Sequence, residues 1–175
     1  MAARGLCRLI RYESADGSRL SEETHGYFTG VGGPEWRNLP QPSSTPLSTP
    51  AGFEAFARPE LLAHWWGPNG FTNTFEVFEF RPGGRWKFVM HGPDGSNHPN
   101  ESIFLELHGP SKLVIQHVSQ PRFVLTVTLA PHAAGTAITW AQEFEDSSVA
   151  ARIRHIVEPA NEQNLDRLLS VLAGG

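Results

Sequence analysis

The side chains best suited to hold a small molecule are spread over the second two-thirds of this chain. His117 follows Leu113 and Ile115 on one face of a predicted strand, where its imidazole could anchor a ligand carbonyl or hydroxyl or remain a hydrogen-bonded core histidine. Asn161 and Asn164 lie at or beside the apolar stripe of the last helix, where they could bond to a ligand or cap the helix. The candidate apolar lining is Trp66, Phe71, Trp86, Phe88, Met90, Phe123 and Trp140. Apolar walls with a few polar groups are typical of small-molecule sites.

Sharper motifs for catalysis or metal binding are absent from the sequence. The 8 histidines show no His-Glu-x-x-His spacing, the single Cys7 excludes a thiolate zinc site, and no Gly-x-Ser-x-Gly elbow occurs. We therefore predict no catalytic residue, metal or cofactor. Glu76, Glu79, Glu143 and Arg122 could reach inward as acid, base or counter-ion, or form the solvated face of strands.

Composition narrows the class of protein. The chain has 175 residues, 39% of them hydrophobic, and a net charge of −4, which favours one globular domain. It has no Lys/Arg cluster, which argues against nucleic acid and anionic membranes as partners. No apolar run reaches the roughly 18 residues of a membrane helix, and no signal-peptide core follows the basic N-terminus. We expect a cytoplasmic protein; the oligomeric state stays open.

Alternation with a period of two predicts about six antiparallel strands, and a later helical period predicts one long helix. The strands fall near 75–80, 85–91, 103–107, 113–117, 123–129 and 138–144. In them Phe75 alternates with Phe78, and Ile103, Leu105 and Leu107 share a face. Two short helical turns, at 53–57 and 59–66, precede the strands, and the long helix spans about 146–173, with Val149, Ile153, Ile156, Ala160, Leu168 and Leu172 on its apolar stripe. Pro159 inside it predicts a kink or a break.

This order of elements predicts an internal cavity. A sheet with one apolar face must cover that face, and the long helix is its main cover. A helix is only about 10 Å across, whereas six strands spaced about 4.8 Å apart span more than twice that. The sheet must therefore curl around the helix, and we expect a space lined by its inward aromatic side chains.

Several segments resemble one known family, in that family's order. They are Ala55–Pro68, the Pro-Gly-Gly turn in Phe80–Trp86, the stretch from His117 to Thr128, and Asn161–Leu168. Over about 53–173 the chain is similar to the activator of Hsp90 ATPase homologue-1-like family, of the START/Bet v 1-like (SRPBCC) group. The resemblance implies an α+β helix-grip fold, a curved antiparallel sheet around a long C-terminal helix with two short N-terminal helices, and an apolar cavity for lipids, polyketides or similar molecules.

Residues 1–52 depart from this resemblance. The family usually begins with a strand and a longer first helix, whereas here scattered Gly and the Pro-rich stretch at 40–50 indicate an irregular extension. Either a strand at 6–12 supplies the family's first strand, or the sheet lacks that strand. A shifted reading frame or misplaced start is an alternative explanation of this segment.

Three functions remain open from the sequence. The first is binding of a small hydrophobic or aromatic ligand. The second is an enzyme of the cyclase or dehydratase kind, which needs His117 next to a carboxylate. The third is a chaperone partner of the Hsp90 type, as the family name implies, although 1–52 is too short for the additional N-terminal domain of the eukaryotic activators.

Overall fold

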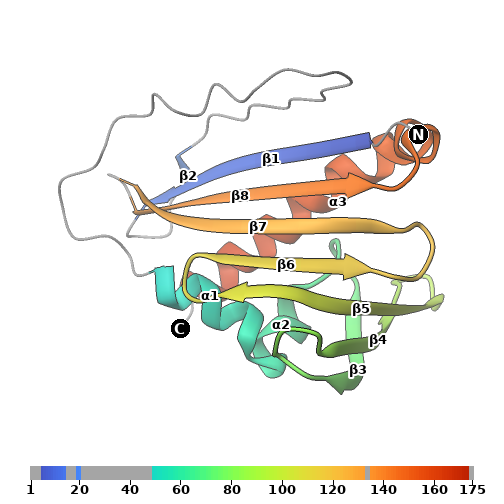
Figure 1. Cartoon of the computed structure of the whole chain (residues 1–175), viewed down its shortest axis with the longest axis horizontal. Helices are drawn as coiled ribbons and strands as arrows, with labels where there is room; N and C mark the ends of the chain where they lie inside the picture. The colour runs from blue at the N-terminus through green and yellow to red at the C-terminus, as the bar shows by residue number, and fades with distance from the viewer. Residues whose placement is uncertain (1–4, 15–18, 21–48, 133–134, 174–175) are drawn as a thin grey trace.

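The computed structural model describes residues 5–14, 19–20, 49–132 and 135–173. The elements in chain order are β1 (Gly5–Ser14), β2 (Arg19–Leu20), α1 (Thr49–Ala57), α2 (Pro59–Trp65), β3 (Thr72–Phe78), β4 (Arg85–His91), β5 (Asn97–His108), β6 (Lys112–His117), β7 (Phe123–His132), β8 (Gly135–Phe144) and α3 (Ser147–Ala173). The predicted α+β architecture is confirmed: an antiparallel sheet, two short helices and one long C-terminal helix (Figure 1).

The six predicted strands form a meander, β3 to β8, in which each strand pairs with the next. The sheet continues past β8, because β1 pairs antiparallel with the whole of β8, from Gly5 opposite Phe144 to Ser14 opposite Gly135. The short β2 follows at the edge. Of the segment predicted to be irregular, 21–48 lies outside the described residues, and α1 begins at Thr49.

Two bulges correct the predicted faces of β3 and β5. An irregularity between Phe75 and Val77 brings Phe75 and Phe78 to the same face, where their rings stack 5.7 Å apart. A second lies between Phe104 and Glu106: Phe104, just before it, is buried, whereas Leu105, within it, is 42% exposed. A bulge inserts one residue into a strand and reverses the alternation beyond it, so a uniform period of two cannot locate the face.

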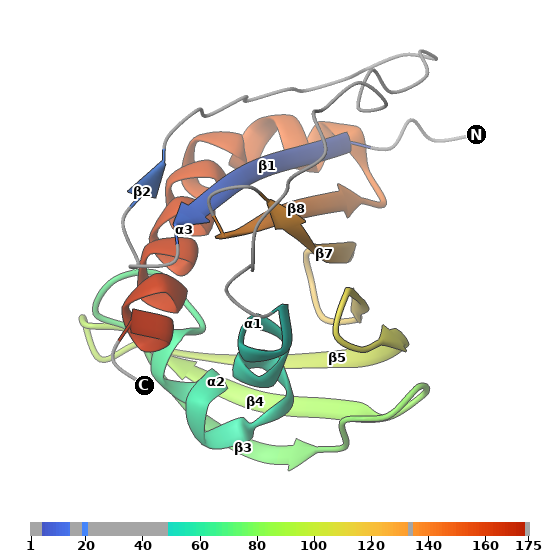
Figure 2. The same cartoon turned by 90° about the vertical axis from the view of Figure 1, so that its left-hand side faces the viewer.

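The long helix α3 is continuous through Pro159, so the predicted break is absent. Pro159 has no N–H to donate to the carbonyl oxygen of His155, four residues earlier in the helix. Both residues are exposed, so this carbonyl oxygen can bond to water instead. Figure 2 shows the helix following a curved path along the sheet. Asp146 caps it by accepting from the Ser148 N–H at 2.8 Å. Ile156, predicted on the apolar stripe, is 60% exposed, because the buried contacts of α3 come from its second half.

The sheet curls strongly around its apolar face (Figure 2). Trp86 lies on β4 and Trp140 on β8, strands that are separated by β5, β6 and β7. In a flat sheet they would be about 19 Å apart at 4.8 Å per strand. Yet both indoles contact the same side chain, Trp66, with ring centroids 4.8 and 5.6 Å away. The inner face is therefore concave, and its aromatic side chains converge.

Candidate functional site

The centre of the concave face is a cluster of aromatic rings around Trp66. Besides Trp86 and Trp140, Trp66 packs against Trp65 with centroids 5.4 Å apart. Trp86 stacks on Phe88 at 4.4 Å. Trp65, Trp86, Phe88 and Trp140 are buried, whereas Trp66 is only partly buried. The structure thus brings together four of the predicted lining residues, and Met90 packs against the same cluster from its edge.

Two of these indoles carry hydrogen-bond donors with no partner among the described residues. They are Nε1 of Trp86 and Nε1 of Trp140, in side chains that are 0% and 2% exposed. The neighbouring Trp65 differs, because its Nε1 donates to the Ala55 carbonyl oxygen at 3.0 Å. An unpaired buried donor costs about 1–3 kcal/mol, so buried donors are normally satisfied. The interior therefore offers two N–H groups that are free to bind an acceptor.

His117 lies on the same inner row of the sheet as Trp86. Strand pairing sets Trp86 opposite Ser102, Ser102 opposite His117, and His117 opposite Phe123. The imidazole stacks on the Phe123 ring, with centroids 4.6 Å apart. Its Nδ1 lies 2.9 Å from the Pro121 carbonyl oxygen and its Nε2 lies 2.9 Å from Oδ1 of Asn100. The ring is thus held by the protein on both sides.

Burial lowers the pKa of His117, and hydrogen bonds to the Pro121 and Ser119 backbone offset this only in part. The unfolded chain then takes up this proton more readily than the folded one, so stability is lost as pH falls below about 6.5. We expect His117→Gln to remove this dependence. Below about pH 6.5 the free energy of unfolding of the wild type should fall by up to about 1.4 kcal/mol per pH unit more than that of the variant. Urea denaturation from pH 7 to pH 5 measures it; parallel curves for the two proteins would contradict the assignment.

The two asparagines have different partners, and α3 continues through both positions. Asn161 donates from Nδ2 to Oε1 of Gln142 at 3.0 Å, and both side chains are 7% exposed. Asn164 accepts at Oδ1 from the Gly67 N–H at 2.5 Å and so ties α3 to the loop after α2. Gln142 was missed as an inward polar residue, although the period of two places it on one face with Trp140 and Phe144.

Sequence reasoning also missed Arg167, which holds that loop in place. Its guanidinium donates to four carbonyl oxygens, those of His64, Gly67, Pro68 and Phe71, at 2.6, 2.7, 2.8 and 3.0 Å. Phe71 belongs to this loop and lies apart from the buried cluster, with its ring 6.0 Å from that of His98. Because Trp66 immediately precedes Gly67, the clamp also sets where the central indole lies.

Comparison with known proteins now identifies the family. The model of the family described as "Activator of Hsp90 ATPase homolog 1-like protein" matches residues 51–173. The chain belongs to this family. The predicted family and the predicted helix-grip fold are therefore confirmed, and the family match begins with α1, after β1 and β2.

Solved structures similar to this chain agree with the fold. A protein from Nitrosomonas europaea matches with a TM-score of 0.67 and 21% identity, over 73% of this chain and 88% of its own. One from Arthrobacter aurescens gives 0.68 and 24%, over 74% and 81%. One from Chromobacterium violaceum gives 0.64 and 23%, over 73% and 91%. A comparison with curated proteins gives no match.

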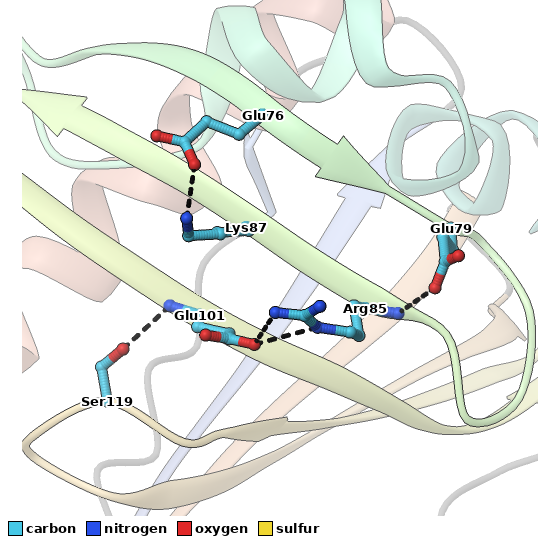
Figure 3. Close-up of polar contacts among 6 residues, drawn as sticks. All are labelled: Glu76, Glu79, Arg85, Lys87, Glu101 and Ser119. Carbon is cyan, nitrogen blue, oxygen red and sulfur yellow. Dashed lines mark hydrogen bonds and ion pairs between the residues drawn. The ribbon is translucent and has the colours of Figure 1, made fainter.

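The outer face of the sheet in this family member is ionic (Figure 3). Lys87 pairs with Glu76 at 2.7 Å and Arg85 with Glu101 at 2.6 Å, while Glu79 accepts from the Arg85 backbone N–H at 3.0 Å. The alternative that Glu76 and Glu79 reach inward as acid or base is thus wrong, because both lie on solvated surface with cationic neighbours.

The side chains buried against the inner face differ, within the ranges 50–131 and 136–172 for which the structure describes burial. The buried polar side chains there are Ser102, His117, Thr136, Gln142, Asn161 and Asn164, with no Asp, Glu, Lys or Arg among them. Those described residues also contain no group of three or more His, Cys, Asp or Glu placed to hold a metal ion. Within the same ranges no helix has the length and apolar composition needed to cross a membrane.

Proposed function

We propose that this chain binds one small hydrophobic or aromatic molecule between the concave face of its sheet and the helix α3. The observation that carries the proposal is the convergence of Trp86 and Trp140 on Trp66, in an interior whose buried side chains over 50–131 and 136–172 include no Asp, Glu, Lys or Arg. Large flat apolar surfaces bind aromatic and aliphatic guests, and few polar groups are needed to orient them. The family fold is that of a general ligand-binding domain.

The polar groups of the interior support binding rather than chemistry. Both ring nitrogens of His117 face oxygens of the protein, and Gln142 bonds to Asn161. A cyclase or dehydratase mechanism needs an acid and a base within reach of a substrate. The partners of His117, a carbonyl and a side-chain amide, are not carboxylates. A binding role needs no such acid–base pair, and fits an interior formed largely by aromatic side chains.

A guest would enter the interior beside the side chain of Trp66. This residue is the one member of the Trp66, Trp86 and Trp140 group that is only partly buried, and it begins the clamped loop after α2. A guest entering beside Trp66 would contact its ring and then the two buried indoles. Such a guest should quench indole emission, because it lies within a few ångströms of several rings.

The neutral dye N-phenyl-1-naphthylamine tests the proposal. We expect saturable one-to-one binding, seen as dye fluorescence and as quenched tryptophan emission. Trp66→Ala should weaken binding about tenfold, because an aromatic contact at the centre of a site carries much of the affinity. Leu105→Ala is the matched control, since Leu105 is an exposed apolar residue elsewhere. Thermal melts confirm that both variants fold; unsaturable binding, or equal affinities in all three proteins, would contradict the proposal.

A further inference from the structure

The unpaired indole N–H groups of Trp86 and Trp140 indicate which polar group the ligand carries, in addition to its apolar surface. Each belongs to a tryptophan that is at least nine-tenths buried, and each lacks a hydrogen-bond partner among the described residues. The other buried tryptophan of the cluster, Trp65, has its N–H paired with a carbonyl. The lack of a partner is therefore specific to the two indoles that flank Trp66, and not a general feature of these rings.

The chemistry of these groups is one-sided. An indole N–H donates and cannot accept, so its partner must be an acceptor such as a carbonyl, ether or hydroxyl oxygen. A carbonyl oxygen has two lone pairs and can accept from one donor or from both.

The lining also limits the charge of the ligand. Within 50–131 and 136–172 no Lys or Arg is buried, and the buried His117 has a pKa lowered by burial. A carboxylate, sulfonate or phosphate would therefore lose its hydration without gaining a counter-ion, which is strongly unfavourable. At the two indoles a cationic ligand would meet N–H donors rather than carboxylates. A neutral molecule with an acceptor oxygen avoids both penalties.

We infer that the ligand is a neutral, mainly apolar molecule with one or two acceptor oxygens, of the aromatic ketone, ester or quinone class, held by Nε1 of Trp86 and Nε1 of Trp140. This inference rests on the proposed function and refines it. Trp66 supplies the aromatic contact between the two donors, since its ring lies 4.8 Å from that of Trp86 and 5.6 Å from that of Trp140.

Three tricyclic probes of nearly the same shape test it: 9-fluorenone, which has a ketone, fluorene, which has no acceptor, and fluorene-9-carboxylate, which is anionic. Their dissociation constants are measured on the full chain by tryptophan quenching. We expect fluorenone to bind at least about fivefold more tightly than fluorene, the effect of one neutral hydrogen bond. The carboxylate should bind more than about tenfold more weakly than fluorenone.

Variants then locate the donors. Trp86→Phe with Trp140→Phe keeps two aromatic rings and removes both N–H groups. In this double variant the preference for fluorenone over fluorene, the ratio of their two dissociation constants, should fall at least about fivefold. Trp65→Phe is the control; it removes an N–H already bonded to Ala55 and should leave the preference unchanged. Each single variant identifies the contribution of one donor if the double variant is poorly folded by circular dichroism.

Two spectra report the hydrogen bond itself. The carbonyl stretch of fluorenone should lie at lower frequency when it is bound to the wild type than when it is bound to the double variant. The indole ¹H–¹⁵N signals of Trp86 and Trp140 should shift when fluorenone binds to the wild type. If fluorene and fluorenone bind equally and the carbonyl stretch is unchanged, this inference is wrong and the proposed function stands. If none of the three probes binds, and the naphthylamine dye does not bind either, the proposed function fails with it.

Discussion

Gly84→Ala is expected to destabilise the protein by about 3 kcal/mol or more. Gly84 is buried in the turn between β3 and β4, where it donates its N–H to the Arg81 carbonyl and accepts at its own carbonyl from Phe104 N–H, at 2.8 and 2.9 Å. A Cβ added at this position would overlap the Glu79 carbonyl oxygen and lie 2.9 Å from that of Arg81. Both obstacles are backbone atoms that cannot turn aside. Urea denaturation monitored by circular dichroism measures the loss.

The adjacent Gly83 provides a matched control. It has a φ of +74°, and an added Cβ would meet no atom within 4 Å. Gly83→Ala should therefore cost only about 1–2 kcal/mol, the strain of a left-handed backbone at a non-glycine residue. Equal losses at both positions would show that the turn can relax around the methyl group. The turn matters for the site because it leads directly into β4, which carries Trp86 and Phe88.

Arg167→Ala is the second substitution for which we expect a large loss, about 3 kcal/mol. Its guanidinium supplies hydrogen bonds to the carbonyl oxygens of His64, Gly67, Pro68 and Phe71, and alanine would leave these four acceptors without that donor. Arg167→Lys should recover only part of the stability, because an ammonium cannot match the planar set of donors. Denaturant titration of each variant measures the effect.

Arg152→Ala is the control for Arg167. Arg152 lies on the same helix but is exposed, and its loss should change stability by less than about 0.5 kcal/mol. If Arg167→Ala cost no more than Arg152→Ala, the loop after α2 would be held by its other contacts, such as Asn164 to Gly67 and Gln163 to Asn69. In the expected case the same variant should also weaken dye binding, because Trp66 would lose its fixed position.

Much of the lining could be predicted because the strands that carry it are regular. Trp86, Phe88 and Trp140 lie on strands without a bulge near them, so a period of two assigned them to the inner face correctly. The same rule failed for Phe78, which follows a bulge that shifts the alternation by one residue, and for Leu105, which lies within a second bulge. His117 was placed on the inner row, but its partners Asn100 and Pro121 come from a neighbouring strand and a loop, which no local pattern reveals.

Local physical chemistry thus determined the elements of this protein. Side-chain alternation specified six strands, helical periodicity and the Asp146 cap specified α3, and glycine and proline marked the turns, since each of these depends on residues close together in the chain. Only the tertiary structure decided which side chains meet across the fold. The curl of the sheet brings Trp86 and Trp140 to Trp66, and α3 brings Arg167 to carbonyls about a hundred residues earlier in the chain. Whether a buried donor such as the Trp86 N–H has a partner likewise depends on the whole fold, because backbone curvature and bulges, rather than residue type, decide what each donor faces.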